Sequence, residues 1–219
     1  MKYADEMRAR LPATMRLPDE FEALFDWIEA NGFFMPSGRF PGDRLGMLCS
    51  SDGPHQGTVI LLRIETAEQA QESGEAWLGN AVPDVAERLV PFARTGGDGS
   101  YAAFWMDDTG QQQIVNLGSE GQVCILAPTP LDFLRLLGIG YEEISGDCLY
   151  DPNAVPDDSG GRRIVVNDAY RTWLTSHYDV TIPRTASEIV GNVPDSSGAT
   201  SSDPFWRWVH FNQAKRNRD

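Results

Sequence analysis

Four short apolar segments recur at close intervals in the middle of the chain, and their spacing restricts the possible folds more than any other feature. The segments are residues 89–93, 101–106, 113–117 and 123–127. The residues between them are rich in Gly, Asp and Ser, which are typical of tight turns. Connections this short join antiparallel neighbours, because parallel strands need a crossover of about a dozen residues or more. The sequence therefore predicts an antiparallel meander.

An apolar stripe in residues 18–31 predicts an amphipathic helix ahead of the meander. The stripe consists of Phe21, Leu24, Phe25 and Ile28, at the i, i+3, i+4, i+7 spacing of one helical face. Pro18 suits the first helical position, and Asn31 with Gly32 can close the last turn in the left-handed conformation. A second, shorter helix is expected directly after the meander, with Thr129 as its N-cap.

The two amphipathic helices and the meander together predict the fold class. One face of a lone antiparallel sheet must be covered, and two helices on that face give an α+β layer architecture. Residues 45–49 and 58–64 predict two further strands joined by a turn-rich loop. Residues 67–78 are rich in Glu, Gln and Ala and predict a helix, interrupted by Gly74, that we expect on the surface.

The chain is expected to form one main domain with an appended segment. Its 219 residues, 41% of them hydrophobic, can bury a sizeable core. We assign residues 1–147 to the α+β domain and residues 148–219 to an extension that packs on the same domain. The extension contains a third predicted amphipathic helix at 168–177, a flexible stretch near 195–202 and an aromatic and basic tail.

The net charge restricts the class of binding partner, and the cysteines indicate the cellular compartment. The formal net charge is -14, which repels phosphate backbones and favours encounter with a basic partner, although plain solubility accounts for the charge of most acidic proteins. Three cysteines without a CxxC pair predict reduced cytosol, with Cys124 acting as a small buried hydrophobe. No apolar run approaches the roughly 18 residues of a membrane span. We therefore expect a cytoplasmic protein that binds neither nucleic acid nor membrane.

No motif in the chain points strongly to catalysis. Asp108-Thr109-Gly110 matches the active-site string of aspartic proteases, but it occurs once, and the same residues suit a turn between two strands. His55, His177 and His210 are widely separated and have no metal-ligand spacing. No phosphate-binding loop, hydrolase elbow or calcium loop is present in the sequence. We expect no cofactor and no bound metal.

The order of these parts resembles the SUKH superfamily, which includes bacterial immunity proteins and a yeast regulator of cell-wall glucan synthesis. The resemblance covers residues 15–145: Leu17-Pro18, the helix ending at Asn31-Gly32, the Gly-Asp-Gly turn before Tyr101, the meander, and a helix carrying Asp132-Phe133-Leu134. Its best-matching stretch is residues 92–141, especially 114–121 and 131–137. The resemblance implies a curved antiparallel sheet flanked by helices, no catalytic residues, and binding of a toxin domain, often a nuclease or deaminase.

The candidate toxin-binding residues lie in and beside the meander turns. They are Asp98, Trp105, Asp107, Asp108 and Glu120. Acidic side chains would meet a basic toxin surface, and a large aromatic residue would anchor it. The alternative is that the turn acids are merely solvated and that Trp105 belongs to the core, because residues 101–106 are apolar on both faces.

Three functions are set against each other. The leading one is an immunity-type protein, a monomer or weak dimer, that occludes a cognate toxin with a basic surface by steric and electrostatic means. The second is a non-catalytic regulatory or scaffold protein related to the cell-wall synthesis regulator. The third is a hydrolase, for which Asp108 is the only carboxylate that the sequence identifies.

Overall fold

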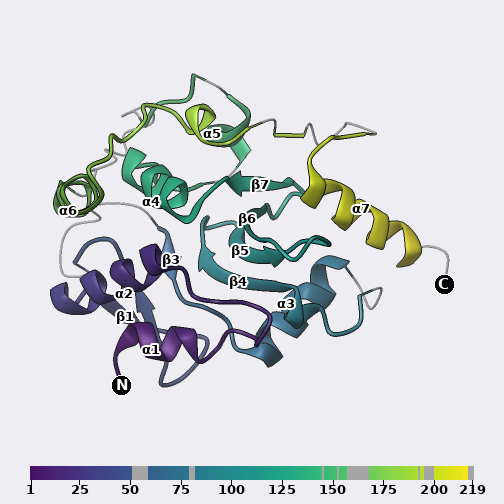
Figure 1. Cartoon of the computed structure of the whole chain (residues 1–219), viewed down its shortest axis with the longest axis horizontal. Helices are drawn as coiled ribbons and strands as arrows, with labels where there is room; N and C mark the ends of the chain where they lie inside the picture. The colour runs from purple at the N-terminus through teal and green to yellow at the C-terminus, as the bar shows by residue number, and fades with distance from the viewer. Residues whose placement is uncertain are drawn as a thin grey trace.

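The strands form one antiparallel sheet in which neighbours in space are also neighbours in sequence (Figure 1). The computed structural model describes residues 1–50, 59–78, 82–144, 146–151, 153–156, 168–191, 193–194 and 200–216. The strands are β1 (Phe34–Pro36), β2 (Arg44–Gly46), β3 (Leu61–Leu62), β4 (Leu89–Arg94), β5 (Tyr101–Met106), β6 (Gln112–Leu117) and β7 (Val123–Ala127). The predicted meander is confirmed as β4 to β7. The predicted loop after Ser50 and most of the stretch 195–202 lie outside the described residues.

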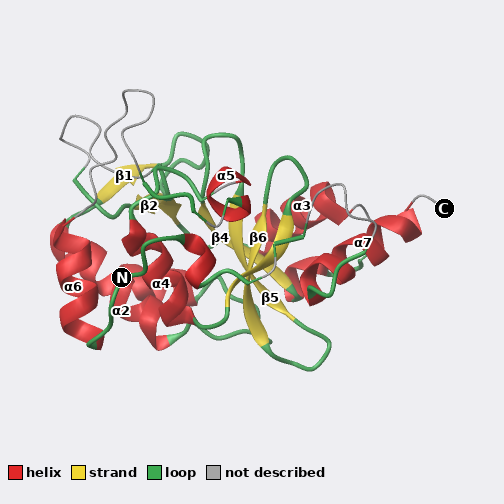
Figure 2. Ribbon diagram, turned by 90° about the horizontal axis from the view of Figure 1, so that it is seen from above, coloured by secondary structure: helices red, strands yellow, loops and turns green. Residues whose placement is uncertain are grey.

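Helices cover both faces of this sheet. They are α1 (Tyr3–Arg8), α2 (Asp19–Asn31), α3 (Ala67–Leu78), α4 (Pro130–Ile139), α5 (Gly146–Tyr150), α6 (Asp168–Tyr178) and α7 (Pro204–Arg216), with 3-10 turns at Val85–Glu87 and Ala186–Glu188. In both views α2, α4 and α6 lie on one side of the sheet, and α3 with α7 lie on the other (Figures 1 and 2). The α+β class, with a sheet flanked by helices, is confirmed, and α2 and α4 lie on one face as expected. The other face is covered as well, by α3 and α7. The central strands are apolar on both sides, so both sides need a cover.

The larger core lies between the sheet and the helices α2 and α4. Phe21 of α2 sits at its centre, with ring centroids 4.9 Å from Phe92, 5.1 Å from Phe104 and 5.7 Å from Phe133. All four rings are fully buried. Aromatic side chains of this size bury more apolar area than any other residue type, so this cluster is a major source of the stability of the fold.

A second core fills the space between the opposite face and the helices α3 and α7. Trp105 of β5 lies under Phe205 and Trp208 of α7, with ring centroids 5.2 and 5.6 Å away. Gly74 of α3 packs directly against Val85, where a Cβ would lie 2.8 Å from Cγ2 and closer still to Cγ1. The glycine that seemed to interrupt this helix therefore allows its close approach to the neighbouring turn. The helix is not merely a surface element.

The ends of the helices follow the signals in the sequence, with small shifts. Helix α2 ends at Gly32 in the left-handed conformation, with φ of 66°. Pro18 is the N-cap residue and not the first helical residue. The Thr129 side chain accepts a hydrogen bond from the Asp132 backbone N–H, as expected for an N-cap, and α4 then continues to a left-handed Gly140.

Candidate binding surface

The meander places the four predicted acids at opposite ends of the sheet. Asp98 lies in the turn between β4 and β5, and Glu120 lies in the turn between β6 and β7. Asp107 and Asp108 lie in the turn between β5 and β6, at the far end of these strands. Strand β5 has six residues, which corresponds to about 20 Å between the two turns. The structure therefore brings Asp98 and Glu120 to one end and separates them from the other pair.

Hydrogen bonds hold the Asp98 carboxylate in a fixed orientation. One oxygen accepts a hydrogen bond from the Ser100 backbone N–H at 2.9 Å, and the other accepts from the hydroxyls of Ser100 at 3.0 Å and Ser119 at 2.7 Å. Partial burial alone would raise the pKa of Asp98, but these donors outweigh it and hold the pKa below its usual value. The side chain is exposed and stays charged, and the turns carrying Asp98 and Glu120 are tied together through Ser119.

Glu143 joins this end of the sheet, although the sequence did not single it out. Its carboxylate accepts a hydrogen bond from the Gly97 backbone N–H at 2.9 Å. Next to it, the Ile144 N–H donates to the Thr95 carbonyl at 2.9 Å, which attaches this segment to the end of β4. We refer to Asp98, Glu120 and Glu143 as the acidic turn cluster. A segment some 45 residues away in sequence is involved, so local pattern could not have identified it.

A cation lies beside the acidic turn cluster. The guanidinium of Arg94 donates to the carbonyls of Gly96 at 3.0 Å and Gly97 at 2.9 Å, and these bonds hold it against the turn backbone. Hydrogen bonds hold two of the three carboxylates of the cluster, those of Asp98 and Glu143.

The other end of the meander forms a self-contained turn. The Gly110 N–H donates to the Asp107 carbonyl at 3.1 Å, and Gly110 has φ of 80°. The Asp107 carboxylate accepts from the backbone N–H groups of Thr109 and Gln111 at 2.8 and 2.9 Å. Burial alone would raise the pKa of Asp107, but its hydrogen bonds, first that from the Thr109 hydroxyl, outweigh this effect and hold the pKa below its usual value. The interpretation of Asp-Thr-Gly as a turn is confirmed.

Asp108 is a surface residue that pairs with a cation. Its side chain is 82% exposed, and one oxygen lies 2.8 Å from a guanidinium nitrogen of Arg88. An aspartic protease needs a second carboxylate that shares a proton with the first. Among the described residues, the partner of the Asp108 carboxylate is the guanidinium of Arg88 and not a second carboxylate.

Trp105 is a core residue and does not anchor a partner. It is 2% exposed and lies beneath α7 in the second core. The prediction that Trp105 belongs to a toxin-binding surface is therefore wrong, and the alternative, that it is a core residue, is confirmed. The reason is that β5 is covered on both faces, so the side chains of its four central residues, Trp105 among them, are buried.

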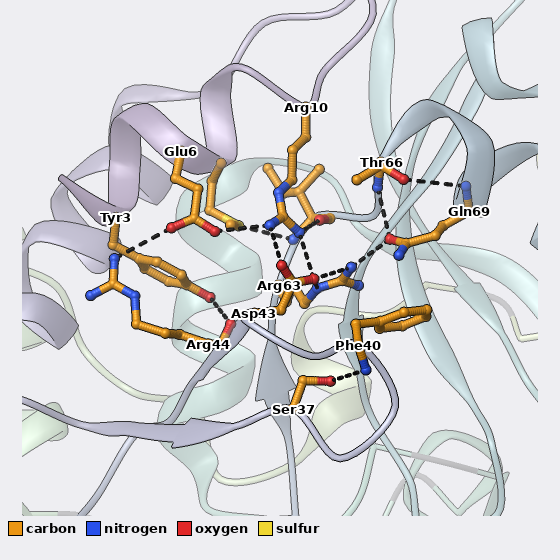
Figure 3. A network of polar contacts seen from close by, with 12 residues as sticks. Tyr3, Glu6, Arg10, Ser37, Phe40, Asp43, Arg44, Arg63, Thr66 and Gln69 are labelled. Carbon is orange, nitrogen blue, oxygen red and sulfur yellow. Dashed lines mark hydrogen bonds and ion pairs between the residues drawn. The ribbon is translucent and has the colours of Figure 1, made fainter. Parts of the chain in front are cut away.

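A network of buried and half-buried charges joins α1 to the β1–β2 loop and to β3 (Figure 3). Asp43 lies at its centre, 2.9 Å from Arg10 and 2.6 Å from Arg63. Burial alone would raise the pKa of Asp43, but hydrogen bonds from Arg10 and then from Arg63 outweigh it and lower the pKa. Arg63 also bonds to Gln69 and lies over the Phe40 ring, 4.4 Å from its centroid.

Tyr3 completes the same region by bridging two strands. Gly46 of β2 and Leu62 of β3 face each other in the sheet. The Tyr3 hydroxyl accepts a hydrogen bond from the Gly46 N–H at 3.2 Å and donates one to the Leu62 carbonyl at 2.5 Å. A side chain from α1 thus bonds to both members of this strand pair. Each charged or polar group here has a structural partner, so the network serves to attach α1 and the first strands to the sheet.

Potential metal and thiol chemistry finds no support in the described residues. Among them, no three His, Cys, Asp or Glu side chains are grouped so as to hold a metal ion. Cys124 is fully buried in the core, and burial raises the pKa of its thiol, which confirms the reading as a small hydrophobe. No helix in the described ranges has both the length and the apolar character to cross a bilayer.

Comparison of the chain with protein-family models, with curated proteins and with solved structures finds no match.

Proposed function

We propose that the protein is a non-catalytic, immunity-type protein that binds a basic toxin domain and blocks it by occlusion. The observation that carries this proposal is the acidic turn cluster, in which carboxylates from three separate segments gather at one end of the sheet. The SUKH resemblance of residues 15–145 supplies the expectation of an immunity protein, and the cluster supplies a physical means of binding. A nuclease or deaminase toxin, which must itself attract nucleic acid, presents a basic surface.

The fixed orientation of two of these carboxylates favours tight binding. A charged side chain that is already held in place loses little conformational freedom when a partner arrives. Asp98 and Glu143 are held by hydrogen bonds from the turn backbone and from two serines. The net charge of -14 adds a field that attracts a basic partner from a distance, and this raises the association rate most at low ionic strength.

The test is co-expression with the product of the adjacent gene. If the proposal is right, the protein restores growth of cells that express that product and forms a complex with it on gel filtration. The triple variant Asp98→Asn, Glu120→Gln, Glu143→Gln should weaken the complex by about tenfold or more, mainly through slower association in low salt. Absence of both rescue and complex would refute the proposal.

A matched control removes the same charge from another surface. Glu68→Gln, Glu75→Gln and Asp84→Asn change three exposed acids on and beside α3. Asp84 has φ of 52°, a conformation that Asn adopts readily, so this change preserves the backbone. The control should bind within about twofold of the unmodified protein, because it lowers the total charge equally but leaves the cluster intact. Equal weakening by both triple variants would show that net charge alone acts.

A further inference from the structure

Helices α2 and α6 carry a continuous row of aromatic rings at the surface between them. The Trp27 ring stacks on Trp173, with centroids 5.5 Å apart and planes at 29°, and Trp173 stacks on His177 at 5.7 Å and 23°. Tyr178 closes the row, with its ring edge-on to His177 at 4.6 Å. We refer to Trp27, Trp173, His177 and Tyr178 as the aromatic row. The neighbouring positions of α2 and α6 in Figure 2 agree with these contacts.

Docking of α6 does not account for the whole row. Tyr170 and Leu174 already anchor this helix: both are essentially fully buried, and the Tyr170 hydroxyl donates to the Leu134 carbonyl at 2.8 Å. Trp27, Trp173 and Tyr178 in contrast are only half-buried, and His177 is exposed. Partly exposed aromatic residues are the residue type enriched at interaction surfaces.

Acidic side chains border the aromatic row. Glu20 precedes Trp27 by seven residues and so lies on the same stripe of α2. Asp19 and Glu20 lie close enough to Tyr178 to raise the pKa of its hydroxyl, after the larger effect of burial. Asp179 follows directly and is exposed.

One basic residue of α6 lies at the Tyr178 end of this border. Arg171 precedes Tyr178 by seven residues and so lies on the same stripe of α6. The border therefore carries three acidic residues, Asp19, Glu20 and Asp179, and one basic residue, so the surface around the aromatic row combines flat rings with net negative charge.

We propose that the aromatic row is a docking surface for arginine side chains of a basic protein partner. A guanidinium is planar and weakly hydrated, so it stacks on an indole while its N–H groups reach a carboxylate at the ring edge. Lysine provides a point charge without the plane and fits less well. The inference rests on the proposed function in one respect, namely that the partner is basic, and it does not require that the partner be a toxin.

The experiment uses hexa-arginine as the probe and measures its affinity for the full chain by calorimetry at low ionic strength. Hexa-arginine should bind at least about threefold tighter than hexa-lysine. Trp173→Leu should weaken hexa-arginine binding by about fivefold, and Glu20→Gln and His177→Ala should each weaken it by about twofold to threefold. His177 is exposed and Glu20 is only half-buried, so these variants remain informative if Trp173→Leu impairs folding.

A second tryptophan–histidine stack provides the matched control. Trp206 and His210 of α7 stack with centroids 3.9 Å apart, and an exposed arginine, Arg207, lies beside them. The nearby Asp203 already accepts hydrogen bonds from the backbone N–H groups of Trp206 and Ile125. Trp206→Leu should leave the affinity for hexa-arginine unchanged. Equal affinities for the two peptides, or equal losses in the α6 and α7 variants, would overturn the inference.

The outcomes also separate this inference from the proposed function. If the toxin complex forms and only the variants of the acidic turn cluster weaken it, with no specific peptide binding, the aromatic row is not a docking surface and the proposed function stands. If hexa-arginine binds at the aromatic row but the adjacent gene's product does not bind, the inference stands and the proposed function fails. Binding of a single-stranded oligonucleotide in preference to the peptide would overturn the assignment to a basic protein.

Discussion

Replacing Tyr3 by Phe isolates the contribution of one hydroxyl to the attachment of α1. The ring contacts are retained, because Phe occupies the same volume against Phe25 and Phe34, whose centroids lie 5.2 and 4.9 Å from that of Tyr3. What disappears is the bridge between the Gly46 N–H and the Leu62 carbonyl. The change therefore removes two hydrogen bonds between α1 and the sheet at a buried site.

The size of the effect follows from this loss. A buried polar group without its hydrogen-bond partner costs about 1–3 kcal/mol, and the two groups here share one hydroxyl. The Tyr3 ring is fully buried in the core. We expect the free energy of unfolding to fall by about 2 kcal/mol, with a fall in Tm of about 4–8 °C for a chain of this length.

Urea unfolding, monitored by circular dichroism, measures this change. The midpoint should fall without a change in the slope, because the surface exposed on unfolding is the same. Tyr101→Phe is the control: the Tyr101 ring is half-buried, and no hydrogen bond of its hydroxyl is recorded among the described residues, so its loss should be under about 0.5 kcal/mol. If Tyr3→Phe costs no more than this control, the bridge does not contribute to stability as argued.

Three further changes test other features of the structure. Glu65 is buried, and burial raises its pKa above the ordinary 4.5, so its ionisation lowers the free energy of unfolding as pH rises from 4.5 through the higher pKa of the folded state. The stability of Glu65→Gln relative to the unmodified protein should therefore increase across that pH range, and a pH-independent difference would contradict this. Asp203 accepts hydrogen bonds from Trp206 at the start of α7 and from Ile125 of the edge strand β7. Asp203→Ala should lower the free energy of unfolding by about 1–2 kcal/mol and accelerate hydrogen exchange of the Ile125 amide, and unchanged exchange would refute the link. Gly74→Ala should destabilise the fold by about 1–3 kcal/mol, although Ala favours helices, because its Cβ would meet Val85. Adding Val85→Ala to this variant should recover part of the loss, and a Gly74→Ala protein more stable than the unmodified one would refute the close packing.

The candidate surface was only partly predictable. Asp98 and Glu120 could be read from the turns, because turn acids stay near solvent whatever the rest of the chain does. In a meander, successive turns lie at alternating ends of the sheet, so the strand order alone separates these two acids from Asp107 and Asp108. Grouping all four acids as one surface overlooked this. Glu143 could not be found, because its position depends on how a later segment returns to the end of β4.

Local pattern was sufficient wherever a short stretch carries its own physical signal. The four central strands, the left-handed end of α2 at Gly32 and the Thr129 cap of α4 each depend on residues a few positions apart, so the sequence alone determined them. The cover of the second sheet face was decided only by tertiary structure. Helix α7 has apolar residues on several sides, and nothing local says which of them lie over Trp105.

The same distinction applies to the charged groups. The sequence determined that the protein is strongly acidic, because composition needs no fold. Only the folded chain decided which charges are buried and which are presented: Asp43 is held between Arg10 and Arg63, whereas Asp98 remains at the surface with its orientation fixed. The physical reason is that burial, hydrogen bonding and stacking join residues distant in sequence, and these distances are set when the helices pack on the sheet.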